Sequence, residues 1–294
     1  VPIVEREILK GEIIKTPLGH EVLKLSQNIA GYISFKLNAK EGQTIKLRFG
    51  ELIDATGEFS QKNIQCSSKK KTTPLQQIIY PAHEGLNEYK TKFAVFGFQY
   101  VLIETDIKHT SDDFEAIVVS SDIKPTLEFD SSNELLNRLV SCASWSTINN
   151  SLDIPTDCPT RERHGWTGDA QVFFKSAAYL FDYASFTRKY YHDMLDEQKR
   201  NGCFKQISPR GGIDFYMETM DGSPGWSDAG ILLPYRFYKI YNDERILIDN
   251  YEAMKKYAKF ISRRCGGFTL LRKPIHLKGE ARKYLVNKGQ SYGE

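Results

Sequence analysis

The hydrophobic positions in the first 122 or so residues alternate with polar positions, the pattern of strands that bury one face. Gly, Asn and Asp turns separate the alternating stretches, so the pattern predicts an antiparallel β-sandwich. The alternating residues are Ile33, Phe35, Leu37, Ile45, Leu47, Phe49, Phe96, Phe98, Tyr100 and Leu102, and Ala116 to Val119 form a last predicted strand. The segment 52–73 is polar and weakly patterned, and we expect it to cross the sandwich surface.

Beyond Pro125 the apolar residues recur at helical spacing. Ser131 to Glu134 fits a capping box at the start of the first helix. The apolar positions behind it are Leu135, Leu136, Leu139, Val140, Ala143 and Ile148. Further helices are predicted at about 168–181, 184–199, 227–241 and 243–263, and Pro234 is expected to bend or shorten the third of these.

Strands followed by helices, without alternation, predict two segregated domains. We divide them as a β-sandwich domain over residues 1–124 and a helical domain over residues 125–294. Five helices are too few for a complete large helical barrel, so we expect the chain to be part of a longer protein.

Composition and charge narrow the classes of partner. The net charge of +3 is too near balance to predict nucleic acid binding. Apolar stretches stay short of the roughly 20 residues that a membrane helix needs, so no membrane partner is expected. The N-terminal Val-Pro-Ile-Val-Glu-Arg does not resemble a signal peptide and lacks an initiator Met, which is consistent with removal of a preceding segment.

The five cysteines are odd in number, widely spread and free of Cys-x-x-Cys pairs. This pattern argues against a zinc site and against a disulfide framework. It favours a cytoplasmic location, with a periplasmic or secreted protein as the alternative.

One stretch, Asp157 to Gln171, holds three carboxylates, two arginines, a histidine and a tryptophan, and almost nothing aliphatic. A core segment would be apolar at helical or strand period, and a solvated loop would seldom hold Trp. Pro159 and two glycines predict a folded turn. Thr167 can cap the following helix, where a positive dipole end meets the charged loop. The expected apolar positions of that helix are Val172, Phe173, Ala177, Leu180 and Phe181.

Asp157, Glu162 and Asp169 in this stretch are candidates for acid-assisted bond cleavage. Such chemistry needs one carboxyl group that keeps a proton for the leaving oxygen and another that stays ionised. Trp166 could wall such a site or stack on a sugar ring. The alternative is a structural network of these acids with the neighbouring arginines, in which Trp166 anchors the core. The spacing alone leaves both interpretations open.

A second loop, Met220 to Asp228, again places an aromatic residue and two acids in a Gly/Pro-rich segment before a helix. Taken alone, it is typical of a capped helix start, with Asp228 in the first turn and Trp226 as a hydrophobic staple. Its recurrence on the next helical hairpin favours a shared site, because loops at one end of a helical barrel converge on a common pocket.

Other chemistries find little support in the sequence. His164 is the only histidine in the first loop, and no Ser/His/Asp or Cys/His set can be identified. The acids near Cys158 disfavour the thiolate that a nucleophile needs. Gly211 and Gly212 have neither the spacing nor the context of a phosphate or dinucleotide loop. No metal or organic cofactor is therefore expected.

The first loop resembles the central motif of the family-78 glycoside hydrolases, the α-L-rhamnosidases. The matching residues are Asp157-Cys158-Pro159-Thr160-Arg161-Glu162 and Gly165-Trp166-Thr167-Gly168-Asp169-Ala170-Gln171. Segments 28–32, 47–51 and 96–101 resemble the β-domain that precedes the barrel in this family, and segments 225–229 and 290–294 resemble later parts of the barrel. The likeness covers most of the chain.

The resemblance implies a multidomain β + α protein, an antiparallel β-sandwich followed by part of an (α/α)6 helical barrel. It also implies hydrolysis of terminal α-L-rhamnosides with inversion. Carried over by position, Glu162 is the general acid, directly following Arg161 as in a shorter variant of the family motif. The implied substrate-binding residues are Asp157, Arg161, Trp166 and Asp169, with Trp226 and Asp228 as further pocket residues.

The family's general base is a Glu from the later half of the barrel, which we expect beyond residue 294. The 294-residue chain alone is therefore expected to be inactive or nearly so. The complete protein is expected to act on rhamnose-containing oligosaccharides or glycosides. The alternatives are another (α/α)6 glycosidase that takes a different sugar, and a non-catalytic carbohydrate-binding fragment. The sequence predicts no oligomeric state.

Overall fold

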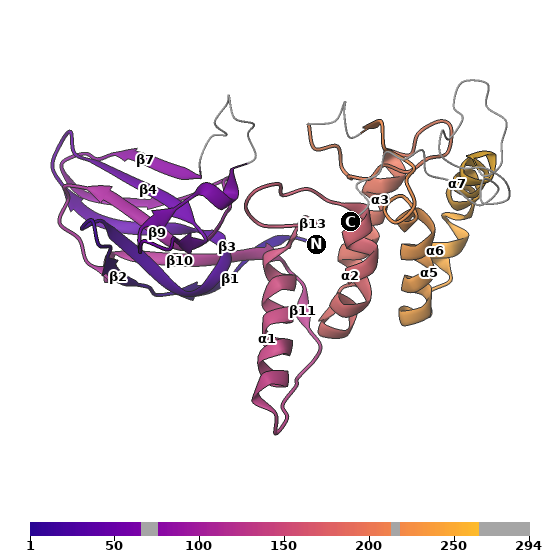
Figure 1. Cartoon of the computed structure of the whole chain (residues 1–294), viewed down its shortest axis with the longest axis horizontal. Helices are drawn as coiled ribbons and strands as arrows, with labels where there is room; N and C mark the ends of the chain where they lie inside the picture. The colour runs from indigo at the N-terminus through magenta and orange to yellow at the C-terminus, as the bar shows by residue number, and fades with distance from the viewer. Residues whose placement is uncertain (66–75, 213–217, 265–294) are drawn as a thin grey trace.

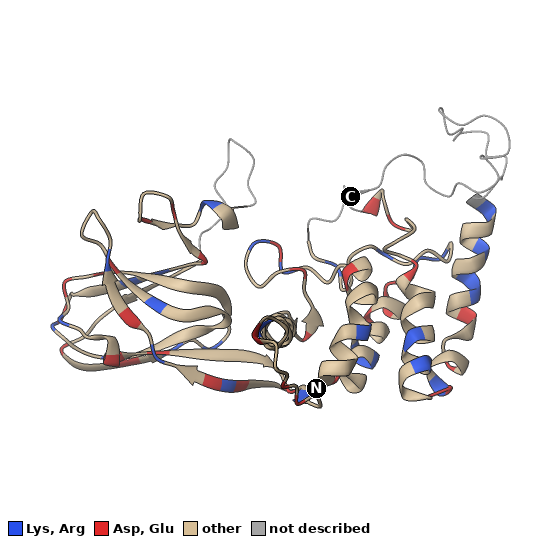
Figure 2. Cartoon of the chain, turned by 60° about the horizontal axis from the view of Figure 1, so that its bottom comes forward, with Lys and Arg blue, Asp and Glu red and all other residues tan. Residues whose placement is uncertain are grey.

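The computed structural model describes residues 1–65, 76–212 and 218–264. A β-rich N-terminal part and a helical C-terminal part follow each other along the long axis of the molecule, with helix α1 (Glu134–Asn149) between them (Figure 1). Basic and acidic residues are interspersed along both parts (Figure 2), in keeping with the small net charge. The predicted order, strands first and helices afterwards, is confirmed.

The strands of the N-terminal part form one eight-stranded antiparallel sheet that curls around a single core. The strands are β1 (Ile3–Leu9), β2 (Glu12–Lys15), β3 (Glu21–Ala39), β4 (Thr44–Gly50), β7 (Gln77–Pro81), β8 (Gly85–Lys90), β9 (Phe96–Thr105) and β10 (Phe114–Ser121). Their order is β1-β10-β3-β9-β4-β7, and β2 and β8 pair with opposite ends of β3. The connections hold the hairpin β5–β6 (Leu52–Ile53, Phe59–Ser60) and the single turns η1 (Lys62–Ile64) and η2 (Ser111–Asp113).

The predicted sandwich has two separate sheets, whereas the structure has one continuous sheet. The 19-residue strand β3 is long enough to take part in both layers. Its first residues, 21–24, pair with β2 and β9, and its last residues, 34–39, pair with β8. The alternation predicted for β3 and β4 is confirmed, because each of its named apolar residues is buried. The excursion predicted over 52–73 is described as far as residue 65, and the rest of it lies outside the described residues.

The helical part comprises α1, α2 (Thr167–Leu180), α3 (Ala184–Asp196), α5 (Ala229–Tyr241), α6 (Arg245–Ile248) and α7 (Tyr251–Arg264). Two short strand pairs connect them, β11 (Lys124–Pro125) with β14 (Phe181–Asp182) and β12 (Ser151–Leu152) with β13 (Ile154–Pro155). Helix α5 packs against α2, α3 and α7 around an aromatic-rich core. The predicted ranges are confirmed within three residues, except that 243–263 is divided by Asp249 and Asn250. Pro234 lies inside α5 without shortening it.

Two predicted helix caps are wrong. Asn133, and not Ser131, caps α1, because its Oδ1 accepts the Leu135 N–H at 3.0 Å. Thr167 is the first residue of α2 rather than its cap, and its buried hydroxyl donates to the Gln206 carbonyl at 3.0 Å. The α1 cap is thus formed by a different residue, and the Thr167 hydroxyl binds a different partner from the one that a cap would have.

The apolar face predicted for α1 is only partly buried. Val140, Ala143 and Ile148 pack on the helical core, whereas the three leucines of the first turns, Leu135, Leu136 and Leu139, are exposed. The first turns of α1 project past the end of α2 (Figure 1), and these leucines are 46–76% exposed. On α2, Val172 is also exposed, and the prediction that it is a core residue is wrong.

Asn149, at the end of α1, joins the two parts of the chain. Its Oδ1 accepts the Ala30 N–H at 2.9 Å, and its Nδ2 donates to the Asn28 carbonyl at 3.1 Å. The pairing of β3 with β10 ends at Gly31, so the Asn149 side chain takes the place of a strand partner for the residues before it. The contact is extended by Trp145, Ile148 and Leu152, which pack on the β core.

Candidate active site

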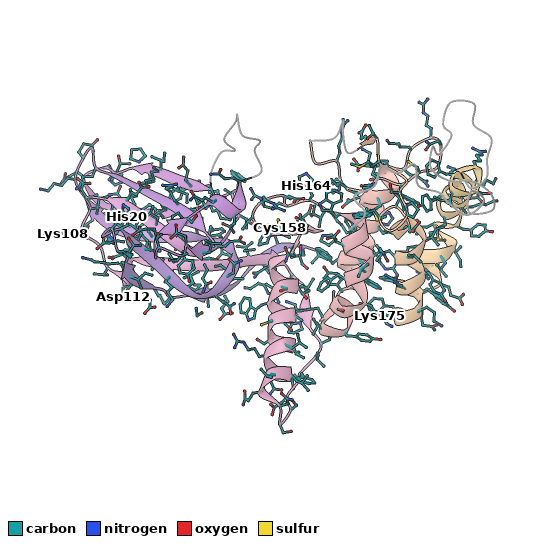
Figure 3. All side chains as sticks on the ribbon, in the orientation of Figure 1. His20, Lys108, Asp112, Cys158, His164 and Lys175 are labelled. Atoms are coloured by element: carbon teal, nitrogen blue, oxygen red, sulfur yellow. The ribbon has the colours of Figure 1, made fainter. Side chains whose placement is uncertain are left out.

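The loop between α1 and α2 contains a turn that is closed by Asp157 and His164. Asp157 Oδ1 accepts the His164 N–H at 2.9 Å, and the Asp157 N–H donates to the His164 carbonyl at 3.1 Å. Arg163, with a left-handed φ of 53°, reverses the chain just before the closure. Figure 3 shows Cys158 and His164 between the β-rich part and α2. Glu162 is therefore carried by a hydrogen-bonded turn, as the glycines and proline predict.

The chain after this turn is anchored to the segment 206–208. The Gly165 carbonyl accepts the Ser208 N–H and the Tyr190 hydroxyl, each at 2.9 Å, and Trp166 forms a β-bridge with Ile207. A Cβ at Gly165 would lie 2.1 Å from the Ser208 carbonyl oxygen, so the close approach requires glycine. Helix α2 thus begins from a fixed point.

The Glu162 carboxylate accepts two hydrogen bonds from its own loop. Arg161 Nη2 lies 2.8 Å from Oε1, and Trp166 Nε1 donates to Oε2 at 3.2 Å. The Glu162 N–H points at Cys158 Sγ, 3.2 Å away. The side chain is 29% exposed, which leaves it open to a ligand. The predicted neighbours of Glu162 are thus in contact with it, in an arrangement that also fits the structural-network alternative.

Asp157 and Asp169 line one cavity of about 550 Å³ beside the end of α1 and the first turns of α2. Other residues that line it are Ser146, Asn150, Thr156, Phe173, Ser176 and Tyr183. Carboxylates, an amide and hydroxyls next to aromatic rings are the groups that hold a small polar ligand. Glu162, Arg161, Trp166 and Trp226 are not among the described lining residues, so the acid and this cavity are neighbours along the loop rather than one enclosed space.

The second predicted loop reaches the first one through Trp226. Its indole lies on Gly168, where a Cβ would be 2.8 Å from Trp226 Cδ1. Gln171 Nε2 also donates to the Gly225 carbonyl at 3.2 Å. The structure therefore brings Trp226 to the first turn of α2, which carries Asp169.

Asp228 is used by the second loop itself. Its Oδ2 accepts the Gly225 N–H at 2.8 Å, and its Oδ1 accepts the Tyr257 hydroxyl at 2.8 Å. These contacts tie the start of α5 to α7. The prediction that Asp228 lies in the first turn of a capped helix is wrong, because Asp228 precedes α5 and its side chain makes no cap hydrogen bond. Asp228 is thus placed differently from Asp157 and Asp169, which line the cavity.

Asp221 is a buried acid for which no site role is predicted from the sequence. Its Oδ1 accepts the Gln206 N–H at 3.0 Å, and its Oδ2 lies 2.7 Å from Lys199 Nζ. Burial lowers the pKa of Lys199, but the hydrogen bond and the charge of Asp221 outweigh burial, and the pKa is raised overall. The pair holds Gln206, whose carbonyl receives the Thr167 N–H at 2.8 Å. Lys199 and Asp221 lie far apart in sequence, so no local pattern could reveal this support.

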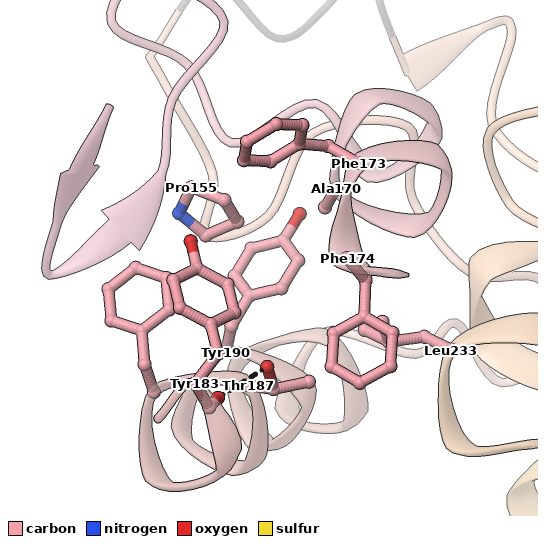
Figure 4. A pocket seen from close by; sticks show the side chains of 9 residues that line it. Pro155, Ala170, Phe173, Phe174, Tyr183, Thr187, Tyr190 and Leu233 are labelled. Atoms are coloured by element: carbon pink, nitrogen blue, oxygen red, sulfur yellow. Dashed lines mark hydrogen bonds between the residues drawn. The ribbon is translucent and has the colours of Figure 1, made fainter. Parts of the chain in front are cut away.

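A smaller cavity of about 10 Å³ is enclosed by aromatic side chains behind Ala170 and Phe173 (Figure 4). Tyr190 lies in its wall, and burial raises the pKa of this tyrosine well above its usual value. The neutral hydroxyl donates to the Gly165 carbonyl. The space holds little more than one water, so these residues support the loop rather than bind a ligand.

Within the described ranges, no group of three or more His, Cys, Asp or Glu side chains is placed to hold a metal ion. No helix in this part of the chain is both long and apolar enough to cross a bilayer. Cys142 is exposed, Cys158 is partly buried and Cys203 is buried. Cys66, Cys265 and the segment 290–294, which resembles a later barrel segment, lie outside the described residues.

Two family models match this chain. The bacterial alpha-L-rhamnosidase 6 hairpin glycosidase domain matches residues 124–276, and the bacterial alpha-L-rhamnosidase concanavalin-like domain matches residues 14–120. An alpha-L-rhamnosidase of Formosa agariphila is 33% identical over 240 residues, which are 80% of this chain and 25% of that protein.

Solved structures give the same result. The crystal structure of Streptomyces avermitilis alpha-L-rhamnosidase complexed with L-rhamnose is similar with a TM-score of 0.82 at 28% identity, over 90% of this chain and 25% of that one. The alpha-L-rhamnosidase of Dictyoglumus thermophilum is similar with a TM-score of 0.80 at 32% identity, over 89% of this chain and 29% of that one.

The present chain therefore spans about a quarter of the length of these relatives. The match of the six-hairpin domain extends over more than half of the chain, and the concanavalin-like match covers most of what precedes it. The chain belongs to the bacterial α-L-rhamnosidase family, as a concanavalin-like domain followed by part of a six-hairpin glycosidase domain.

Proposed function

We propose that the protein to which this chain belongs hydrolyses terminal α-L-rhamnosides with inversion, and that Glu162 is its general acid. The observation that carries the proposal is the contact of Glu162 with Arg161 and Trp166, on a fixed turn beside Asp157 and Asp169. The relatives named above are alpha-L-rhamnosidases, and one is described as complexed with L-rhamnose, which supports this choice of sugar.

Asp157 and Asp169 are proposed to bind the sugar. Both line the cavity beside α2, and an ionised carboxylate accepts strong hydrogen bonds from sugar hydroxyls. The bond from the His164 N–H to Asp157 Oδ1 fixes the orientation of that carboxylate. Trp166 and Trp226 would supply apolar faces to the ring, whereas Asp228 would act through the shape of the second loop.

In the proposed reaction Glu162 gives its proton to the glycosidic oxygen as the bond to the anomeric carbon breaks. A water molecule attacks the opposite face of that carbon and loses a proton to a second carboxylate, about 6.5–9.5 Å from the first. We expect the second carboxylate in the part of the protein outside this chain, which spans 25% of its relatives. Arg161 Nη2 and Trp166 Nε1 each occupy one oxygen of Glu162, and the transferred proton takes a remaining lone pair of the carboxyl group.

The test compares the complete protein with the 294-residue chain on an aryl α-L-rhamnoside. The complete protein is expected to release rhamnose, first as the inverted β anomer by NMR, and the chain alone is expected to be inactive. Turnover by the chain alone at enzyme-like rates would show that the second carboxylate lies within it.

Two alternatives predict other outcomes. A different (α/α)6 glycosidase would hydrolyse glucosides or galactosides in preference to rhamnosides. A carbohydrate-binding protein would bind rhamnose without turnover, and the Arg161–Glu162 ion pair is the observation that favours it. Parallel assays on the three sugars, with rhamnose binding measured by calorimetry, separate these outcomes.

A further inference from the structure

We propose that the start of strand β9, in the β-rich part, positions the general acid of the helical part, with Gly97 and Arg163 as the positioning residues. The inference deepens the proposed function and rests on it for the role of Glu162. It gives the β-rich part a share in catalysis through the position of Glu162.

Gly97 contacts the loop that carries Glu162, residues 157–164, which we call the acid loop. The contact lies just before Glu162. A Cβ at Gly97 would lie 2.3 Å from Thr160 Cγ2 and 2.9 Å from the Pro159 carbonyl oxygen. Thr160 is 7% exposed, so its methyl group has little free space to move into. Gly97 lies in a regular strand opposite Ala30, so the site requires its small size rather than its backbone freedom.

Arg163, just after Glu162, contacts Val95, the residue that precedes the same strand. Its Nη1 donates to the Val95 carbonyl at 2.6 Å, and its left-handed φ of 53° sets the direction in which the side chain leaves the turn. The contacts at Thr160 and Arg163 therefore bracket Glu162 and converge on two residues of one strand start, Val95 and Gly97. A third contact, from the Glu162 N–H to Cys158 Sγ, closes the turn from inside.

The start of β9 is itself held rigidly at this point. The Gly97 N–H donates to Gln76 Oε1 at 3.0 Å, and on the paired strand the Ala30 N–H donates to Asn149 Oδ1 at 2.9 Å. Gln76 and Asn149 are both buried. The support thus has its own hydrogen bonds and does not depend on the acid loop for its shape.

Displacing this support should affect proton transfer more than binding. A shift of about 1 Å in a catalytic group can cost roughly 10²-fold in rate. The loss should be largest for substrates whose leaving oxygen needs a proton, and small for an activated aryl rhamnoside, whose leaving group departs as an anion.

The experiment uses the complete protein with Gly97→Ala and Arg163→Gly, which keeps the left-handed turn but removes the bond to Val95. The matched control is Gly50→Ala in the same sheet, where a Cβ would lie 2.8 Å from the Phe59 ring. We expect both test variants to lower kcat roughly tenfold or more on an unactivated disaccharide and much less on an activated aryl rhamnoside. The control should change both substrates equally. Equal losses in the test variants would overturn the inference.

A second readout does not need hydrolysis. Cys158 Sγ accepts the Glu162 N–H, so loosening of the turn should raise the rate at which iodoacetamide alkylates Cys158, relative to the exposed Cys142 in the same protein. Peptide mass spectrometry measures the ratio. An unchanged ratio in Gly97→Ala would overturn the positioning role. Failure of the unmodified protein to hydrolyse rhamnosides would instead refute the proposed function, and the alkylation ratio would still decide the role of β9.

Discussion

Trp166 donates its indole N–H to Oε2 of Glu162 at 3.2 Å, and its backbone is fixed by a bridge to Ile207. The residue that orients the carboxylate is therefore anchored outside the acid loop, at the point where α2 begins. Trp166 therefore links the anchoring of the start of α2 to the orientation of the Glu162 carboxylate.

Replacing Trp166 by Phe tests that contact, because Phe keeps an aromatic face and loses the N–H. A hydrogen bond to a charged group contributes about 1.5–3 kcal/mol, so we expect kcat of the complete protein on an unactivated rhamnoside to fall by roughly tenfold or more, with a smaller change in KM. Steady-state kinetics measure the two parameters. A rise in KM with kcat unchanged would mean that Trp166 contributes to sugar binding and does not orient Glu162.

The contact of Gly168 with Trp226 predicts a coupled pair. Gly168→Ala places a methyl group 2.8 Å from Trp226 Cδ1, and we expect it to destabilise the chain by about 1–3 kcal/mol in urea unfolding. In the complete protein it should raise KM. Combining it with Trp226→Leu should relieve the crowding, so that the two changes are less than additive. Strict additivity would mean that the two loops do not depend on each other.

The Lys199–Asp221 pair predicts a loss of stability at alkaline pH. The folded pKa of Lys199 is raised above its ordinary value of 10.5 by Asp221, although burial acts in the opposite direction. The pair therefore contributes its full stability below that ordinary pKa and loses it as pH rises through the folded pKa.

Lys199→Arg is the matched variant, because a guanidinium stays charged throughout this range. Urea unfolding from pH 8 to 11.5 should show a smaller alkaline loss of stability in the variant than in the unmodified chain. Burial raises the pKa of Tyr190 and Tyr191 in the same way in both proteins, so the comparison isolates Lys199. If the free energy of unfolding fell equally with pH in both proteins, the Lys199–Asp221 pair would not contribute to stability.

Local patterns were enough to predict the element types of this fold. Strands such as β3 and β4 carry their alternation in consecutive residues, and the helices carry theirs within a few turns. The predictions fail where a partner comes from elsewhere in the chain. Thr167 has the chemistry of a cap, but its hydroxyl donates to the Gln206 carbonyl. The leucines on the first turns of α1 have the spacing of a buried face and are nevertheless exposed.

The same distinction applies to the candidate site. The contacts of Glu162 with Arg161 and Trp166 lie within one short stretch, so the motif predicts them. The approach of Gly97 to Thr160 joins the β-rich and the helical part. The segment 96–101 resembles the β-domain of the family, but that likeness does not predict a contact with the loop of Glu162. The division of the chain at residue 124 and its cytoplasmic location stay predictions.

The central claim is that Glu162 protonates the departing oxygen. The most direct measurement is the turnover of the complete protein carrying Glu162→Gln on α-L-rhamnosides whose leaving groups are graded in acidity. General acid catalysis contributes about 10²–10⁴-fold, so the account predicts a loss of that order on unactivated substrates and a much smaller loss on the most activated one. Undiminished turnover of an unactivated rhamnoside by Glu162→Gln would contradict it.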